Sequence, residues 1–326
     1  MCRKSIWLVV IFLIISGCAY SHKTIREKVH TVYVVEGSRD SMVGRFAPAF
    51  LTYNHREAYN RIGRPSARFD KRKNEQIYVD HRKPVIYFMT RDFSTHKGCY
   101  TNLIYRIQFP RVPFSLIPYH LSAGKNVGLL VIVTMDEDQR PLLITTVGTC
   151  GCYVASVPTT YLSLDAFPKD WKNELLFVYG ERLPAILNYK NLKKPRLLVH
   201  LRSAVHRVMD LEVAEEEMLL ASALYTTISA PLTPAEALEK IPIKGKTTSF
   251  YHNKWPLKGH VKGAIKPWET LLLSIVSLDF FVGMDKVYGD SSVTGNPFYT
   301  SLKPWNRKAS DLWEFQRFLK FRGWRL

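Results

Sequence analysis

Residues 127–147 of the chain read VGLLVIVTMDEDQRPLLITTV, two apolar runs joined by a short polar connection. Aliphatic and β-branched residues dominate both runs, and such runs favour strands. The connection from Asp136 to Gln139 has a length that suits a hairpin. The LLVIV stretch of the first run is apolar at every position instead of at alternate ones. We therefore expect a central strand that is covered on both faces.

Similar runs earlier in the chain predict further strands of the same sheet. The stretches PVIYFMT at 84–90 and LIYRIQF at 103–109 are rich in β-branched and aromatic residues, as is VHTVYVV at 29–35. Because turn residues separate the successive runs, the sequence predicts an antiparallel sheet.

Beyond this region, helix-compatible segments alternate with proline-rich turns. Residues 211–225 carry several glutamates ahead of an apolar stretch, where negative charge suits the positive end of a helix dipole. The apolar segment LLLSIVSLDFFVGM at 271–284 follows Pro267, which suits a first helical position. This segment is too short to span a bilayer comfortably, so we expect a buried core helix.

The C-terminal residues 310–326, SDLWEFQRFLKFRGWRL, mix large aromatic and basic side chains. Their spacing predicts an amphipathic helix whose start Ser310 can cap. One interpretation packs the aromatic face onto the body of the protein. The other lays a basic, aromatic face against a membrane.

The fold class that these patterns predict is α+β. A β-rich part over 29–165 with an antiparallel sheet precedes a more helical part over 166–326, and the two parts can form one continuous domain. The chain of 326 residues is long enough for a sizeable core, and 18 prolines with 17 glycines indicate many turns rather than a helical bundle.

The N-terminal residues 1–18, MCRKSIWLVVIFLIISGC, place a short positive head before an apolar run. The run suits the core of an export signal, and it is short of the roughly 20 residues of a membrane-spanning helix. The last four residues, ISGC, resemble the lipobox of bacterial lipoproteins. In that class the cysteine, here Cys18, is acylated and becomes the first residue.

This resemblance implies a signal peptide over 1–17 and a lipidated cysteine with a short polar tether over 18–28. It implies a body close to the periplasmic face of a cell membrane, with membrane lipids as partners of the acyl anchor. Ala19, in place of an aspartate, resembles the outer-membrane sorting pattern of enteric bacteria. An uncleaved N-terminal anchor with an incidental cysteine is the alternative.

The chain is strongly basic, with 46 Lys and Arg against 28 Asp and Glu, a formal net charge of +18. Loss of Arg3 and Lys4 with the signal leaves 44 basic and 28 acidic residues, a net charge of +16. An exported protein with this charge is expected to meet anionic headgroups, an anionic envelope polymer or a protein partner, and no nucleic acid. A diffuse solubilising surface is the alternative.

Three cysteines remain in the mature chain, and with one histidine they form the densest constellation of candidate ligands. His96 and Cys99 stand in an HxxC arrangement, and Cys150 and Cys152 in a CxC arrangement about fifty residues later. Three thiolates and an imidazole suit tetrahedral zinc, and the two thiolates of the CxC suit Cu(I). A disulfide from Cys99 to either CxC cysteine is the competing interpretation, and a Cys150–Cys152 redox pair is a third.

No familiar catalytic motif accompanies these residues, since GxSxG, HExxH and CxxCH are all absent. We therefore assign no catalytic residues. The leading hypothesis is a membrane-anchored envelope lipoprotein that acts as a noncatalytic binding or assembly factor. The alternative is a metal-binding or thiol-redox lipoprotein that uses the Cys/His cluster.

Overall fold

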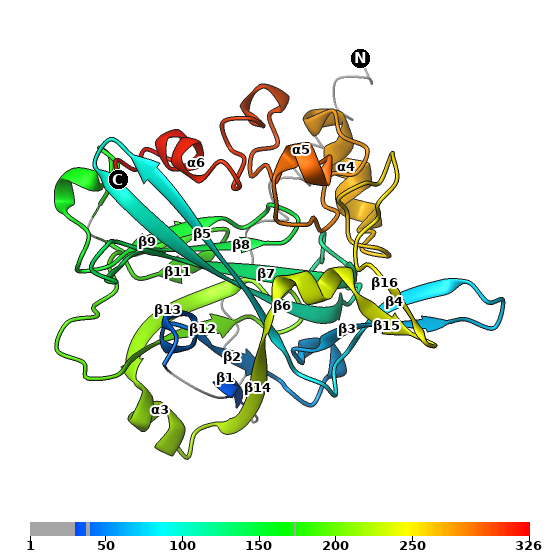
Figure 1. The fold of residues 1–326 in the computed structure, drawn as a ribbon, viewed down its shortest axis with the longest axis horizontal. Coiled ribbons are helices and arrows are strands. Elements are labelled where there is room, and N and C mark those ends of the chain that lie inside the picture. Colours follow the sequence, from blue (N-terminus) through cyan, green and yellow to red (C-terminus); the bar gives the residue numbers. More distant parts are fainter. Residues whose placement is uncertain (1–29, 37–39, 173) are drawn as a thin grey trace.

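The computed structural model describes residues 30–36, 40–172 and 174–326, so the predicted signal peptide, Cys18 and the predicted tether lie outside the described residues. Ten strands form one curled sheet (Figure 1). They are β1 (His30–Glu36), β2 (Ala49–Tyr53), β5 (Ile86–Thr95), β6 (Gly98–Val112), β7 (Gly124–Met135), β8 (Pro141–Gly148), β9 (Ala155–Pro158), β12 (Pro195–Leu201), β13 (Val208–Glu215) and β14 (Thr226–Pro234). Their order across the sheet is β13-β12-β2-β1-β14-β5-β6-β7-β8-β9.

Smaller elements surround this sheet. Three two-stranded hairpins are β3 (Arg64–Phe69) with β4 (Glu75–Asp80), β10 (Leu176–Val178) with β11 (Glu181–Leu183), and β15 (Ile241–Ile243) with β16 (Lys246–Thr248). The α-helices are α2 (Met42–Arg45), α3 (Glu216–Ala221), α4 (Pro267–Ser277), α5 (Ser291–Thr294) and α6 (Phe315–Phe321), and the 3₁₀ turns are η1 (Ala58–Asn60), η2 (Leu164–Ala166), η3 (Ala235–Glu239) and η4 (Pro304–Asn306). Across the described part of the chain, no helix combines the length and the apolar character needed to cross a membrane.

The predicted antiparallel strands are confirmed in β5 to β9, which pair consecutively as an antiparallel meander. The connection between β7 and β8 is the expected short turn, in which the Asp136 carboxylate accepts hydrogen bonds from the backbone N–H of Arg140 at 2.8 Å and from its guanidinium. β7 lies between β6 and β8, and nearly all its side chains are buried on both faces, as its apolar run predicts.

The curled sheet carries a hydrophobic core on each face. On one face, side chains such as Tyr105 of β6 and Val131 of β7 pack with residues of β1, β2 and β12. Because this core joins strands that are distant in the sheet order, it lies on the concave side. The other face of the same two strands, with Ile104 and Ile132, packs against the C-terminal segment around α6 (Figure 1).

The α+β class is confirmed at this coarse level, with strands dominant and helices gathered toward the C-terminus. The separation into an antiparallel sheet before residue 165 and helices after it is incomplete. β12, β13 and β14 come from the later half and join the same sheet, and β14 pairs in parallel with both β1 and β5. The sheet is therefore mixed, and its two halves cannot be separated without breaking strand pairing.

The predicted helix over 211–225 is wrong for its first five and its last four residues. Residues 211–215 belong to β13, and only the short α3 follows. Leu211 is buried in the concave core, and Glu212 pairs with Leu198 of β12. Pairing with β12 thus outweighs the local tendency of the glutamate-rich stretch to form a helix.

The segment 271–284 starts in a helix as predicted, with Pro267 at the first position of α4. It is not the buried core helix that we expected. Ile275 is 80% exposed and Phe280 is 84% exposed, whereas the buried residues of α4 are Glu269 and Ser277. The polar side of the helix faces the protein, because Glu269 takes part in a buried cluster.

The helix predicted over 310–326 is confirmed only in its middle, as the seven-residue α6, which packs onto the body. α6 buries Phe315, Phe318 and Leu319 in the core on the convex face of the sheet. The predicted cap is wrong, because the helix starts after Glu314. The Ser310 hydroxyl instead accepts hydrogen bonds from the backbone N–H groups of residues 300 and 301.

Candidate metal centre

The four predicted ligand residues lie at two ends of the central strands. Cys150 and Cys152 follow the C-terminal end of β8, whereas His96 lies in the tight turn between β5 and β6 and Cys99 at the start of β6. Cys99 is exposed, and its sulfur lies 3.5 Å from the Ser94 hydroxyl. His96 is also exposed.

The register of β7 shows how far apart the two groups are. Thr101, two residues after Cys99, pairs with Met135, whereas Gly148, two residues before Cys150, pairs with Leu129. Met135 and Leu129 are six positions apart on β7, which is about 20 Å of extended chain. The structure therefore does not assemble the Cys₃His set, and Cys99 cannot form a disulfide with either CxC thiol. The prediction is wrong because β6 and β8 lie on either side of β7, and the cysteines lie at opposite ends of these two strands.

The structure brings a third ligand to the CxC pair. Glu269, in the first turn of α4, places a carboxylate oxygen so that it and the two sulfurs all lie within 4.8 Å of one another. Cys152 Sγ donates to Glu269 Oε1 at 3.1 Å. Glu269 Oε2 is buried and has no hydrogen-bond partner among the residues that the structure describes. Glu269 follows Cys152 by 117 positions and belongs to no motif with it. The only sign of its role in the sequence is that it is the one acidic residue of α4.

Two glycines make room for this arrangement. Gly151 adopts φ +93°, and a side chain there would collide with the backbone carbonyl of Tyr299. Gly283 adopts φ +84°, and its missing Cβ would lie 2.8 Å from Cδ of Glu269. Both positions favour glycine for conformation and for space. The turn between the cysteines thus requires glycine at 151, and the close approach of Glu269 requires glycine at 283.

A buried ion pair flanks the three candidate ligands. Lys266 Nζ lies 2.7 Å from Asp285 Oδ1, and both side chains are almost completely excluded from solvent. The second oxygen of Asp285 accepts from the backbone N–H of Gly128 at 2.8 Å and from the Thr149 hydroxyl. The two oxygens of Asp285 thus accept from an ammonium group, a backbone N–H and a hydroxyl.

A second buried cation lies against the backbone of the CxC turn. Lys286 Nζ donates to the carbonyl oxygen of Cys150 at 2.8 Å and lies 4.2 Å from the ring centroid of Tyr299. Burial lowers the pKa of Lys286, while the two neighbouring thiols act to raise it. The positive charge of the Lys286 ammonium thus stabilises negative charge on the nearby sulfurs.

The two thiols differ in acidity. A hydrogen bond from Cys152 lowers the pKa of Cys150, against the opposing effect of burial, and the Lys266 ammonium lowers it further. The hydrogen bond with Cys150 and burial raise the pKa of Cys152. Burial alone lowers the pKa of Lys266, but the charges of Asp285 and Cys150 outweigh this effect and hold it well above its ordinary value. Cys150 is therefore the more acidic thiol of the pair.

A small cavity of about 30 Å³ borders Cys150 and Lys266, with Gly128, Tyr153 and His206 among its walls. A cavity needs on the order of 10–15 Å³ to hold one water molecule. A water could thus stand beside the Cys150 sulfur.

The donor set and its spacing fit a transition metal ion. Tetrahedral zinc with bonds of about 2.0–2.3 Å places its ligand atoms roughly 3.3–3.8 Å apart. The observed limit of 4.8 Å allows this geometry after small side-chain shifts. Three protein ligands leave a fourth position for a water. Two thiolates alone suit Cu(I), which prefers soft sulfur over a carboxylate.

The described part of the chain offers one group of at least three such ligands within this spacing, and it is Cys150, Cys152 and Glu269. No protein-family model, no curated protein and no solved structure matches this chain. Function is therefore inferred from the residues of the chain itself.

Proposed function

We propose that the protein is a lipid-anchored, noncatalytic binding protein of the bacterial envelope whose body holds one metal ion through Cys150, Cys152 and Glu269. The observation that carries the metal proposal is the convergence of these three ligand atoms within 4.8 Å in a buried site. Zn²⁺ is the ion that a mixed set of sulfur and oxygen ligands favours. Cu(I) is the second candidate, held by the two sulfurs alone.

Two further features support a metal over a Cys150–Cys152 disulfide. The unpartnered Glu269 Oε2 is a buried acceptor that gains a partner when a cation binds. The Lys266 ammonium lowers the pKa of Cys150 and so favours its thiolate, which is the form that binds metals. A disulfide between the cysteines of a CxC closes a small, strained ring and leaves the glutamate unused.

Metal analysis of the purified protein tests this proposal. We expect about one zinc ion per chain, and either Cys150→Ser or Cys152→Ser should weaken zinc binding by roughly 100-fold or more, because each thiolate supplies a large share of the binding free energy. Glu269→Gln should have a smaller effect, since it replaces a charged ligand by a neutral one. Metal content by mass spectrometry and competition with a chromophoric chelator give both quantities.

Cys99→Ser is the matched control, because it removes an exposed thiol at the far end of β6 and should leave zinc binding unchanged. A stoichiometry near zero after loading with Zn²⁺ and with Cu(I) under reducing conditions would contradict the proposal. A Cys150–Cys152 disulfide in freshly isolated protein, detected by mass mapping, would also contradict it and favour thiol-redox chemistry.

The anchor is tested separately. Cys18→Ser is expected to leave an unprocessed precursor, because only a thiol at this position can accept the diacylglyceryl group. Intact mass of the natural protein should show loss of residues 1–17 and added acyl chains, which hold a protein stably when two or more are present. Cys2→Ser, which changes the other N-terminal cysteine, should be processed normally. Retention of Met1 without acyl mass would refute the anchor and leave the metal proposal standing.

A further inference from the structure

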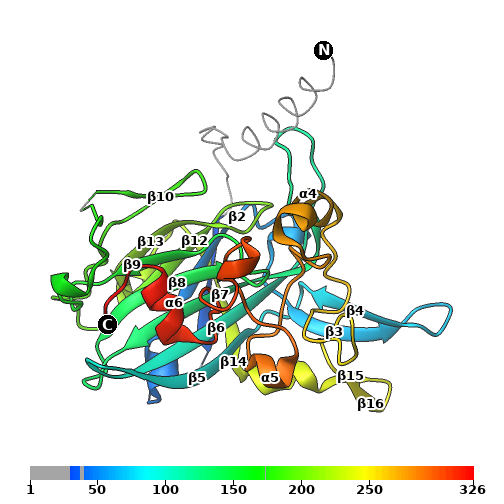
Figure 2. The ribbon, with the colours of Figure 1, turned by 90° about the horizontal axis from the view of Figure 1, so that it is seen from above.

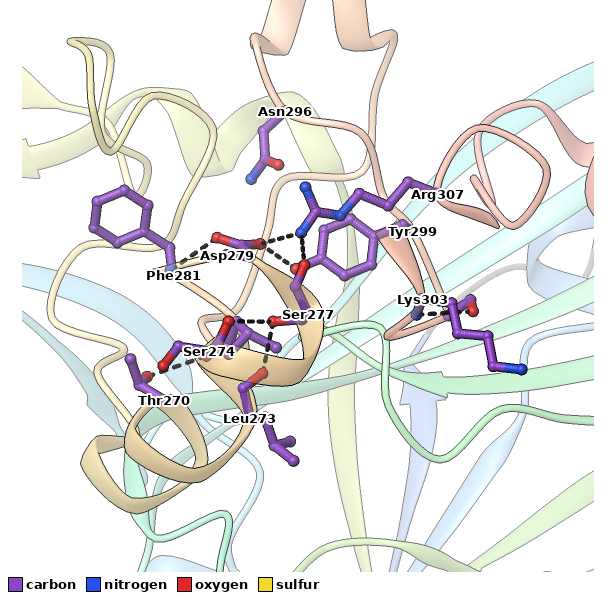
Figure 3. Close-up of polar contacts among 12 residues, drawn as sticks. Thr270, Leu273, Ser274, Ser277, Asp279, Phe281, Asn296, Tyr299, Lys303 and Arg307 are labelled. Atoms are coloured by element: carbon purple, nitrogen blue, oxygen red, sulfur yellow. Dashed lines mark hydrogen bonds and ion pairs between the residues drawn. The ribbon is translucent and has the colours of Figure 1, made fainter. Parts of the chain in front are cut away.

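The outer side of α4 and the residues that follow it form an unusually apolar surface. Leu271, Ile275, Val276 and Leu278 are each more than 60% exposed, and Phe280 is 84% exposed. The polar groups point the other way, with Glu269 in the metal cluster and the Ser277 hydroxyl bound to the Leu273 carbonyl oxygen at 2.8 Å (Figure 3). A surface helix of a soluble domain normally turns its apolar side inward. In α4 the apolar side faces outward and the polar side faces the protein.

A second segment extends this surface. The loop between β6 and β7 rises beside α4 (Figure 2) and exposes Phe114, Leu116 and Ile117, the last at 89%. The rings of Phe114 and Trp268 stack with their centroids 6.0 Å apart, which joins the loop to the first turn of α4. The exposed side chains of 114–117 and 268–280 thus form one surface, here named the apolar face. Contiguous apolar surface of this kind marks an interaction site.

The apolar face presents no free acidic group. Its carboxylates belong to Glu269, which is buried, and to Asp279, which accepts from the Tyr299 hydroxyl and lies 3.9 Å from the Arg307 guanidinium (Figure 3). The described segment 111–125 contains no acidic residue.

Basic side chains lie beside the same face at two places. Arg111 and Lys125 are exposed and pair across β6 and β7 at the base of the loop. Lys303 lies near the C-terminal end of α4 (Figure 3), and Trp305, which is exposed beside it, is a residue type found at membrane interfaces. An apolar centre with a basic rim complements a bilayer with anionic headgroups.

We propose that the apolar face inserts into the membrane that carries the acyl anchor and holds the body against it in one orientation. The inference rests on the proposed anchor for its geometry. Twelve residues from Cys18 to His30 span at most about 40 Å when fully extended, so the anchor keeps the body within reach of the bilayer. Two protruding segments can both enter a bilayer, because its fluid surface adapts to their shape. The basic residues at the edge favour anionic lipid, whereas a protein partner would need acidic side chains at matching positions.

The test uses the full acylated protein in vesicles of phosphatidylethanolamine and phosphatidylglycerol. An environment-sensitive fluorophore is placed at Ile275→Cys in a Cys99→Ser background, and lipids brominated in the acyl chains serve as quenchers. The matched control is Leu224→Cys, which is 74% exposed near α3, far from α4 (Figure 1). Strong quenching at 275 and little at 224 is expected. Labelling of Cys99→Ser alone measures any background from the remaining cysteines.

A second probe links the two segments. With the fluorophore at Leu116→Cys, the added substitution Ile275→Asp should remove most of the quenching at 116, because a charge on α4 opposes insertion of the shared face. Since Ile275 is exposed, thermal unfolding should be unchanged. Equal, weak quenching at 275 and 224 overturns the proposal and points to a protein partner for this face. Intact mass reports acylation independently, so failure of the anchor and failure of insertion are distinguishable.

Discussion

Deletion of residues 311–326 is expected to leave a chain that does not fold. This segment supplies six side chains to the core on the convex face of the sheet, namely Leu312, Phe315, Phe318, Leu319, Trp324 and Leu326. Truncation of one buried Phe already costs about 3–5 kcal/mol, and a protein of this kind is stable by only about 5–15 kcal/mol. Loss of the whole segment therefore exceeds the available stability. Loss of cooperative unfolding by circular dichroism is the measurement.

Two phenylalanines of α6 provide matched point variants. Phe318 is completely buried, whereas Phe321 is 36% exposed. Phe318→Ala should lower the free energy of unfolding by about 3–5 kcal/mol, and Phe321→Ala by less than about 2 kcal/mol. If the truncated protein unfolds cooperatively at a near-natural urea midpoint, the C-terminal segment is dispensable and its packing contributes little.

Asp285→Ala is the second large effect that we expect. The carboxylate is fully buried and is the ion-pair partner of Lys266. Its removal leaves an ammonium in the interior without its charge partner and leaves the donors of Gly128 and Thr149 unsatisfied. Breaking one side of a buried ion pair costs about 3–5 kcal/mol. Urea unfolding in the presence of a chelator measures this loss without a contribution from bound metal.

An exposed pair with the same separation is the control. Lys194 Nζ and Glu217 Oε1 also lie 2.7 Å apart, but both side chains are largely in solvent. Glu217→Gln should change stability by no more than about 1 kcal/mol. The double variant Lys266→Met with Asp285→Asn should recover part of the loss, because it removes the buried charge together with its partner. If Asp285→Ala and Glu217→Gln lowered the free energy of unfolding equally, burial would not determine the strength of the Asp285 ion pair.

Local sequence determined the strands of the meander. The run at 127–135 is apolar at nearly every position, and only a central strand covered on both faces buries such a run completely. The polar residues 136–139 then require a turn at the surface. These are near-neighbour effects, so they can be recognised without knowledge of the rest of the chain. The C-terminal helix belongs to the same class, since its buried residues follow helical spacing.

Long-range contacts decided the rest. Residues 211–215 join β13 because β12 offers a pairing partner, and no local pattern contains that information. The orientation of α4 was also decided at long range. Its apolar residues predict burial, but the cluster of Glu269 with Cys150 and Cys152 turns its polar side inward and leaves the apolar side exposed.

The metal centre shows the same division. The two cysteines of the CxC pair are close in sequence, and so their spacing alone identifies them as candidate ligands. Strand-like runs lie beside Cys99 and His96 as well as beside the CxC pair, so the sequence alone favours one shared site for all four residues. The antiparallel register instead places Cys99 and His96 near the end of β7 opposite to the CxC pair. Glu269 comes from a distant helix and could not be paired with the cysteines from spacing. Sequence determines which groups can bind a metal, whereas strand register and helix orientation determine which of them meet, because those depend on contacts between residues far apart in the chain.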